Sequence, residues 1–152
     1  MPAVHADRPG QRSRSLLGDA GGRVDGRRAL GRLGEELAAA HLRRLGFSVL
    51  ARNVRTRRGE IDLIAFDGAT LVFAEVKARR TTASDRHIDP ALEPLSTLRR
   101  AQRARLRGLA VAWLSDEARI RPSARTIRFD AIGVIVDRRD RLVRLDHLEA
   151  AW

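Results

Sequence analysis

A hairpin pattern between residues 60 and 77 limits the folds open to this chain more than any other part of its sequence. Two segments, EIDLIAF (60–66) and LVFAEVK (71–77), are rich in β-branched and aromatic residues and flank Asp67-Gly68, a strong turn signal. This pattern predicts two antiparallel strands at the centre of a sheet that helices cover.

The alternation of side chains along these strands brings charged groups together. Asp62 shares a face with Glu75 and Lys77 of the neighbouring strand, because successive side chains point to opposite faces. A four-residue loop at 67–70 places Asp62 directly opposite Glu75, whereas a two-residue loop pairs Asp62 with Phe73 and makes Glu75 a diagonal neighbour. Both registers place the Cβ atoms of Asp62 and Glu75 roughly 4.5–8 Å apart. The other face is expected to be apolar, with Ile61, Leu63, Ala65, Val72, Ala74 and Val76.

Two carboxylates at this spacing in a partly buried sheet repel each other unless a cation or a proton joins them. A magnesium or manganese ion resolves the repulsion, because magnesium takes oxygen ligands from one or two carboxylates and keeps waters for chemistry. Phosphodiester hydrolysis is the matching reaction. The pattern therefore predicts a metal-dependent catalytic set of Asp62, Glu75 and Lys77.

Lys77 is the only lysine among 30 basic residues. A compact ammonium can shift its pKa and position a water, whereas a guanidinium is wider, planar and always charged. Arginine would therefore serve poorly at this position. The alternative interpretation is a charged hairpin whose lysine pairs with its acids at the solvent face of the sheet.

The charge balance indicates a polyanionic partner. Thirty basic residues stand against 19 acidic ones, which gives a formal net charge of +11 over 152 residues, a length that suits one domain. Arginine and lysine supply most non-specific affinity for nucleic acids. Ribosomal proteins, membrane-surface proteins and charged tails are alternative explanations. Because only 4% of the residues are aromatic, a dedicated single-strand binder is less favoured.

The chain has no cysteine, which excludes disulfides, thiolate zinc sites and cysteine nucleophiles. No apolar run reaches the roughly 18 residues that span a bilayer, so no membrane partner is expected. Residues 1–28 lack periodicity and an apolar signal region, and we interpret them as a flexible, basic tail before a domain at 29–152. A cytoplasmic location is the default expectation.

The segment 31–45 (GRLGEELAAAHLRRL) predicts a helix that ends before Gly46. Its apolar stripe contains Leu37, Ala38, Leu42 and Leu45. Glu35 falls at the edge of this stripe and is the glutamate that could point into a partly enclosed site. Glu36 lies on the opposite side and should be solvated.

The other segments predict an α/β order. Strands are predicted at 47–52, 126–136 and 142–145, loops at 53–58 and 78–94, and a second helix at 96–114. The stripe of this helix includes Leu98, Leu106, Leu109 and Trp113. Helix, three strands, helix, strand, strand indicate helices layered around a mixed central sheet.

Two groups of mostly basic residues are candidates for nucleic-acid contacts. They are Arg52, Arg55, Arg57 and Arg58 after the first strand, and Arg99, Arg100, Gln102 and Arg103 at the second helix. Arg105 and Arg107 continue the second group. Phosphate contacts give affinity without sequence readout. A solvated helix face is the alternative interpretation.

These segments resemble the restriction-endonuclease-like PD-(D/E)XK nuclease superfamily and, more closely, the small bacterial uncharacterised protein family 0102, often called the YraN family. The resemblance covers roughly residues 31–150. It is carried by GRLGEELAAAHLRRLGFSVLARN (31–53), GEIDLIA (59–65), FAEVKAR (73–79) and IRFDAIGV (127–134).

The resemblance implies an αβββαβ core and specific roles for the site residues. Asp62, Glu75 and the Val76 carbonyl would bind the metal ion, and Lys77 would be the catalytic lysine. Glu35 matches a first-helix glutamate that helps to hold a metal ion in relatives similar to archaeal junction resolvases.

Three functions follow as hypotheses. The first is a Mg²⁺- or Mn²⁺-dependent endonuclease on DNA, with branched or repair intermediates as substrates of a homodimer by analogy. The second is a non-catalytic module that binds DNA or RNA. The third is a protein-interaction subunit whose basic surface meets an acidic partner.

Overall fold

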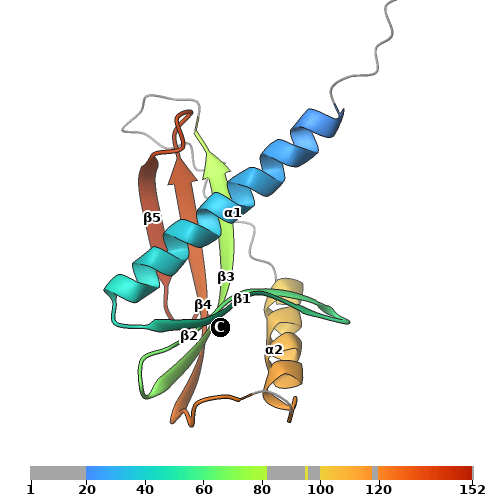
Figure 1. Cartoon of the computed structure of the whole chain (residues 1–152), viewed down its shortest axis with the longest axis vertical. Helices are drawn as coiled ribbons and strands as arrows, with labels where there is room; N and C mark the ends of the chain where they lie inside the picture. Colours follow the sequence, from blue (N-terminus) through green and yellow to red (C-terminus); the bar gives the residue numbers. More distant parts are fainter. Residues whose placement is uncertain (1–19, 82–94, 96–99, 118–119, 152) are drawn as a thin grey trace, which may run out of the picture.

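The computed structural model describes residues 20–81, 95, 100–117 and 120–151. Two helices and five strands follow one another within these residues (Figure 1). The helices are α1 (Ala20–Arg44) and α2 (Arg100–Leu114). The strands are β1 (Ser48–Thr56), β2 (Gly59–Phe66), β3 (Thr70–Arg80), β4 (Thr126–Val136) and β5 (Leu142–Leu148).

The five strands form one mixed sheet in the order β1-β2-β3-β4-β5. Neighbouring strands are antiparallel except β3 and β4, which are parallel. Parallel strands need a crossover connection, and α2 lies within it. The predicted α/β class with a mixed central sheet flanked by helices is confirmed. The arrangement is compatible with a restriction-endonuclease-like core.

The first of the two helices covers one face of the sheet. Ala38 and Leu42 of α1 are fully buried and belong to a cluster that includes Val72 of β3 and Ile132 of β4. This contact buries the small and branched residues of the helix stripe against the middle strands, where burial of apolar surface stabilises the fold. The central part of α1 is therefore fixed on β3 and β4.

Gly34 is the point of closest approach between α1 and β3. A Cβ added at this residue would lie 2.6 Å from the Cβ of Ala78, a separation that real side chains do not adopt. Only glycine lets the helix backbone come this near to the strand. The position of the following residue, Glu35, is set by this packing.

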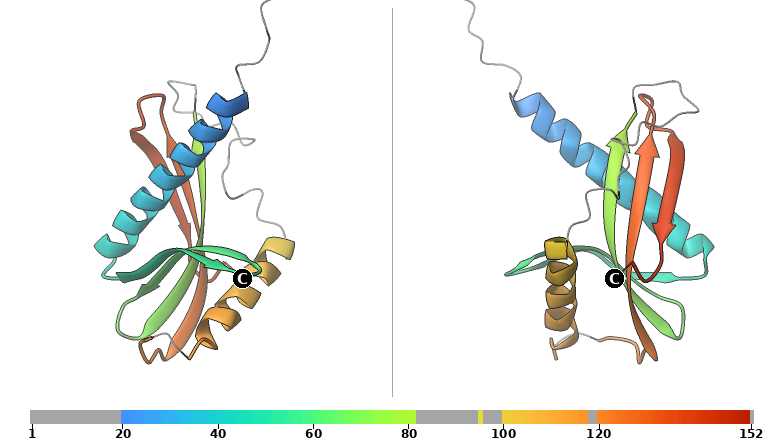
Figure 2. Two further views of the ribbon diagram at one scale, coloured as in Figure 1. Left: turned by 45° about the vertical axis from the view of Figure 1, so that its right-hand side comes forward. Right: turned by 180° about the vertical axis from the view of Figure 1, so that it is seen from behind.

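The second helix covers the opposite face, as the two views of Figure 2 show. The predicted stripe is confirmed for Leu106, Leu109 and Trp113, which are buried against strand residues such as Phe73. The rings of Phe73 and Trp113 pack edge to face with centroids 5.6 Å apart. Leu98 lies outside the described residues.

The limits of α1 differ from the prediction at both ends. The helix begins at Ala20, so residues 20–28, which the sequence analysis assigned to the tail, are helical. Arginine and alanine favour a helix that is already nucleated, and this part extends beyond the sheet (Figure 1). Leu45 is 49% exposed rather than part of the stripe, because the helix ends at Arg44 and the chain turns at Gly46 (φ 93°). Neither helix is long and apolar enough, over its described residues, to cross a membrane.

The predicted basic loop at 53–58 is wrong. β1 continues to Thr56, and only Arg57 and Arg58 form the turn to β2. Thr56 Oγ1 accepts a hydrogen bond of 3.1 Å from the amide of Arg58. Polar residues have a low intrinsic preference for strands. Pairing with β2 nevertheless holds this segment in a strand through backbone hydrogen bonds. In the same way, pairing with β4 extends β3 to Arg80, into the predicted loop at 78–94. Residues 82–94 lie outside the described ones.

Candidate functional site

The turn between β2 and β3 sets the register of the site. Asp67 Oδ1 accepts hydrogen bonds from the amides of Ala69 (2.9 Å) and Thr70 (2.7 Å), and these bonds hold the pKa of the Asp67 carboxyl below its usual range. The four-residue loop 67–70 then pairs Phe66 with Leu71. Of the two registers left open by the sequence, the structure has the one that aligns Asp62 with Glu75.

The ladder between β2 and β3 stops just before the aligned carboxylates. Its last pair is Leu63 with Ala74. At the next step, the amide of Val76 donates a hydrogen bond of 2.7 Å to Oδ2 of Asp62 instead of to the backbone of β2. The N–H and C=O of one strand residue point to the same edge, so the Val76 carbonyl faces the β2 side as well. The strands therefore separate where the acidic side chains begin.

The alternation of β2 changes at the same place. Leu63 shares the cluster under α1 with Ala65 and Val72, as expected for one face, but Ile61 belongs with Ile64 to the cluster under α2. The prediction that Ile61 and Leu63 share a face is wrong. Beyond the end of the β2–β3 ladder, β2 is paired only with β1, and these two strands cross over α2 (Figure 1). Asp62 lies at this change of direction.

Asp62 is in an environment that opposes its negative charge. Burial first, and then the nearby Glu75, raise the pKa of its carboxyl to about 7, although the Val76 amide and Lys77 act in the other direction. Glu35 of α1 adds a smaller contribution that also raises the pKa. A carboxylate in such a place requires a proton or a cation.

Glu75 and Lys77 form an ion pair on the face of β3 that α2 covers. Glu75 is only 4% exposed, and the Nζ of Lys77 contacts its Oε1. The other oxygen, Oε2, lies 4.0 Å from a guanidinium nitrogen of Arg105 on α2. Lys77 is partly exposed, so its ammonium links the buried carboxylate to the surface.

The first helix presents two adjacent glutamates in different ways, as predicted. Glu35 accepts a hydrogen bond of 2.7 Å from Nδ2 of Asn53, and it is close enough to Asp62 to affect that carboxyl. Glu36 is exposed and accepts a hydrogen bond of 2.7 Å from Arg52. Arg52, a predicted nucleic-acid contact, is therefore already paired with Glu36 in this structure.

Asn53 is a site residue that the sequence analysis did not single out. Its φ of 51° lies in the left-handed region, which asparagine tolerates better than most residues. Its neighbours Arg52 and Val54 pair with Leu63 and Ile61, so Asn53 stands across from Asp62 in the β1–β2 ladder. The one sequence feature that could have identified this residue is an asparagine within a strand. Because residues 53–58 were predicted to be a loop, Asn53 was not expected to belong to the sheet.

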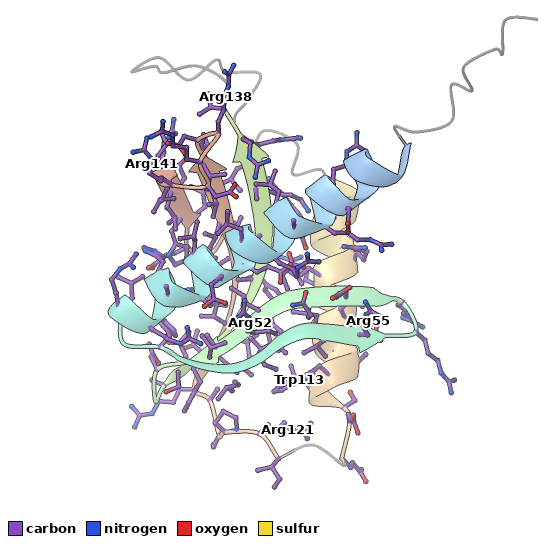
Figure 3. The ribbon with its side chains drawn as sticks, turned by 45° about the horizontal axis from the view of Figure 1, so that its top comes forward. Arg52, Arg55, Trp113, Arg121, Arg138 and Arg141 are labelled. Carbon is purple, nitrogen blue, oxygen red and sulfur yellow. The ribbon has the colours of Figure 1, made fainter. Side chains whose placement is uncertain are left out.

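The arginines at the end of the β1–β2 hairpin are exposed. Arg55 and Arg57 line a hollow of about 350 Å³ together with Trp113 of α2, and Figure 3 shows Arg55 on the hairpin that crosses this helix. The Nε1 of Trp113 is buried and has no hydrogen-bond acceptor within the described part of the chain. Arg55 Nε lies 3.8 Å from Oε2 of Glu60, and Arg58 is exposed.

The remaining predicted contacts lie at the start of α2. Arg103 is exposed and Gln102 is partly buried, and both have interactions with other residues. Arg100 is the first residue of the helix, and Arg99 lies outside the described residues. The structure brings Arg105, which had been grouped with these cations, closest to the carboxylates.

The donor set fits a magnesium-type ion only with bound waters. Among the described residues, no three acidic or histidine side chains are grouped to hold a metal ion by themselves, so Glu35 does not form one group with Asp62 and Glu75. Two carboxylates and the Val76 carbonyl are available. Magnesium binds through one or two carboxylates and keeps several waters, which agrees with this set.

Comparisons with known proteins identify relatives over most of the chain. Residues 34–134 match the family described as "Uncharacterised protein family UPF0102". A UPF0102 protein of Acidothermus cellulolyticus is 44% identical over 126 residues, which cover 78% of this chain and 90% of that protein. A UPF0102 protein of Anaeromyxobacter dehalogenans is 40% identical over 137 residues, 90% of this chain and 93% of that protein.

Proposed function

The chain belongs to the uncharacterised protein family UPF0102, and from the geometry of its carboxylate site we propose that it is a metal-dependent endonuclease that hydrolyses phosphodiester bonds in DNA. The observation that carries this proposal is the hydrogen bond from the Val76 amide to Asp62, which holds Asp62 near Glu75 just past the last β2–β3 pair, Leu63 with Ala74. Burial and Glu75 raise the pKa of Asp62, so a bound cation would relieve an unfavourable charge.

The proposed metal ligands are Asp62, Glu75 and the carbonyl of Val76. The bond from the Val76 amide holds the Asp62 carboxylate against β3, and this leaves the other oxygen of Asp62 for an ion. A magnesium ion, when bound, would supply Lewis-acid activation of the phosphate and of water. Glu35 lies beside this set and would accept a bond from a water of the ion rather than bind the ion directly.

Lys77 and Arg105 are the cations next to the carboxylates. Lys77 would leave Glu75 when an ion binds there, and its ammonium would then hold the attacking water or a phosphate oxygen. Arg105 would donate to another phosphate oxygen, because a guanidinium matches phosphate geometry. Both charges would stabilise the negative charge that develops in the transition state.

The exposed arginines support a nucleic-acid substrate. Arg55, Arg57 and Arg58 lie at the end of the hairpin, and Arg103 lies on α2, which the hairpin crosses. They would neutralise backbone phosphates on either side of the scissile bond and would not read sequence.

The test is cleavage of labelled duplex, single-stranded and four-way-junction DNA with Mg²⁺, Mn²⁺ or EDTA. We expect cleavage that requires metal, that Asp62→Asn abolishes and that Lys77→Ala slows by a factor of about 10²–10³. Glu60→Gln is the matched control, because it removes the same charge from the same strand outside the proposed ligands. Equal cleavage by the wild type and the two site variants would refute the assignment. The four-way junction tests whether branched DNA, bound by a homodimer, is the preferred substrate.

The contact of Lys77 with Glu75 favours a second candidate, a non-catalytic nucleic-acid-binding module. In this alternative the lysine neutralises Glu75 permanently and no metal ion is needed. Salt-sensitive DNA binding without cleavage in either metal would favour the module over the nuclease.

A further inference from the structure

A hollow lined by three arginines lies between α1 and the end of β3, away from the predicted contacts on the β1–β2 hairpin and α2. Its volume is about 640 Å³, and its lining consists of Arg27, Leu30 and Gly31 of α1 with Ala78, Arg79 and Arg80 of β3. The three arginines are exposed, and they come from two elements that meet at this point. Their side chains provide hydrogen-bond donors and no acceptors.

The floor of the hollow is held in place by close packing. Ala78 is the residue against which Gly34 packs, one turn of helix after Gly31. The backbones of helix and strand are therefore held at a fixed separation beside the hollow, and Arg27 and Arg79 both belong to its lining. Two arginines whose backbones are already held near each other bind an anion with less entropic cost than two arginines on segments that must first come together.

The charge of the hollow is positive after its own ion pairs are considered. Arg80 contacts Asp140 of the β4–β5 turn and is neutralised in part. Arg27 and Arg79 have no acidic partner within the described residues. The site therefore suits an anion with several acceptor oxygens, such as a phosphodiester.

The hollow also lies in line with the proposed catalytic site along two elements. Arg79 follows Lys77 by two residues, which is about 7 Å along a strand. Arg27 precedes Glu35 by eight residues, which is about 12 Å along a helix. These spans correspond to roughly two to four nucleotide steps of 3.4 Å. Lys77 lies on the α2 side of β3 and the hollow on the α1 side. Because β2 does not pair with β3 beyond Leu63–Ala74, a strand cut beside Lys77 would cross this edge of β3 to reach the hollow.

We propose that Arg27 and Arg79 bind a backbone phosphate of the nucleic-acid substrate in this hollow, a few nucleotides from the scissile bond. The inference rests on the proposed function, because the bound strand must continue from the carboxylate site. It assigns a role to the part of α1 that extends beyond the sheet (Figure 1). That overhang would add a second anchor on the substrate.

The experiment measures binding of a labelled DNA duplex in EDTA by fluorescence anisotropy, between about 50 and about 200 mM salt. The variants are Arg27→Gln, Arg79→Gln and the double variant. Arg43→Gln is the matched control, since it removes an exposed arginine from the opposite end of α1. All three positions are exposed, and thermal melting checks that each of the four variants is folded.

We expect each variant to weaken binding about fivefold to tenfold and to lower the slope of log affinity against log salt by about 0.9, the value for one phosphate contact. Because both arginines contact the same phosphate, the double variant should also lower the slope by about 0.9 in total, and the control should keep the wild-type slope. A double variant with wild-type slope and affinity would overturn the inference and leave the proposed function intact. Failure of the wild type to bind any DNA would overturn both.

Discussion

The amide of Val76 donates a hydrogen bond to Oδ2 of Asp62 at 2.7 Å, in place of a ladder bond between β2 and β3. This bond holds the carboxylate beside Glu75 although burial and the second acid raise its pKa to about 7. Without a metal ion, the negative charge of Asp62 is therefore unfavourable at neutral pH and destabilises the folded state.

The pH dependence of the free energy of unfolding should show this destabilisation by Asp62 directly. The pKa of Asp62 is higher in the folded state than the value near 4 of an unfolded chain, so the folded state binds the proton more tightly. Its contribution to stability is lost as pH rises from about 4 through about 7. Without metal, Asp62 should therefore contribute less to the free energy of unfolding at high pH than at low pH, by an amount on the order of a few kcal/mol, and the comparison with Asp62→Asn isolates this contribution from those of the other carboxyls.

The measurement is denaturant unfolding in EDTA across this pH range. Asp62→Asn should flatten the dependence and make the metal-free protein more stable at high pH, because the amide carries no charge. Added Mg²⁺ should stabilise the wild type at high pH and leave Asp62→Asn unchanged. A variant that keeps the wild-type pH dependence would show that another group causes it.

Lys77 should be needed for cleavage rather than for DNA binding. Replacement by alanine removes a charge beside the reacting phosphate and should slow single-turnover cleavage by a factor of about 10²–10³. Lys77→Arg should not restore the rate, because a planar guanidinium cannot replace an ammonium against Glu75. DNA affinity should change only slightly in both variants. A fully active Lys77→Arg variant would mean that only the charge matters.

The hairpin was predictable because its pattern is local. Asp67-Gly68 and the apolar residues on both sides predict two strands, and alternation then places Asp62 near Glu75. The choice between the two registers was not predictable, because it depends on the hydrogen bonds that Asp67 makes within the loop. The position of Ile61 was missed because alternation assumes that both neighbours of β2 continue past Leu63.

Contacts between distant segments account for the other differences. Arg105 approaches Glu75 only because α2 crosses under the hairpin, and the spacing of residues in the sequence does not predict this contact. Asn53 looked like a loop residue because its pairing partner lies on another strand. The same reason explains why Gly34 could not be recognised as a packing position.

Asn53 should orient Glu35 for the metal. Asn53→Ala should reduce stability by about 1–2 kcal/mol, because a residue other than glycine or asparagine is strained at a φ of 51°. Asn53→Gly should avoid this strain but still lose the bond to Glu35. Both variants should therefore weaken Mg²⁺ binding, by up to about tenfold. Calorimetric titration with Mg²⁺ separates the two effects, and unchanged metal affinity in both would assign Asn53 to folding alone.

The contact between α1 and β3 should tolerate no side chain. Gly34→Ala places a Cβ against that of Ala78 and should destabilise the fold by about 1–3 kcal/mol. Gly31→Ala on the same helix meets nothing within 4 Å and should stabilise the protein by about 0.5–1 kcal/mol. Denaturant unfolding compares them. Equal effects of the two substitutions would show that helix propensity, not close packing, decides the outcome at Gly34.

The single lysine also makes the site observable in a simple way. Lys77 is the only lysine in the sequence, and its Nζ lies against Glu75. Labelling of lysine with ¹⁵N at Nζ would therefore give one side-chain nitrogen signal, and it would come from the carboxylate site. Displacement of the ammonium by a metal ion would shift that one resonance, so the protein carries its own spectroscopic reporter of whether the site is engaged.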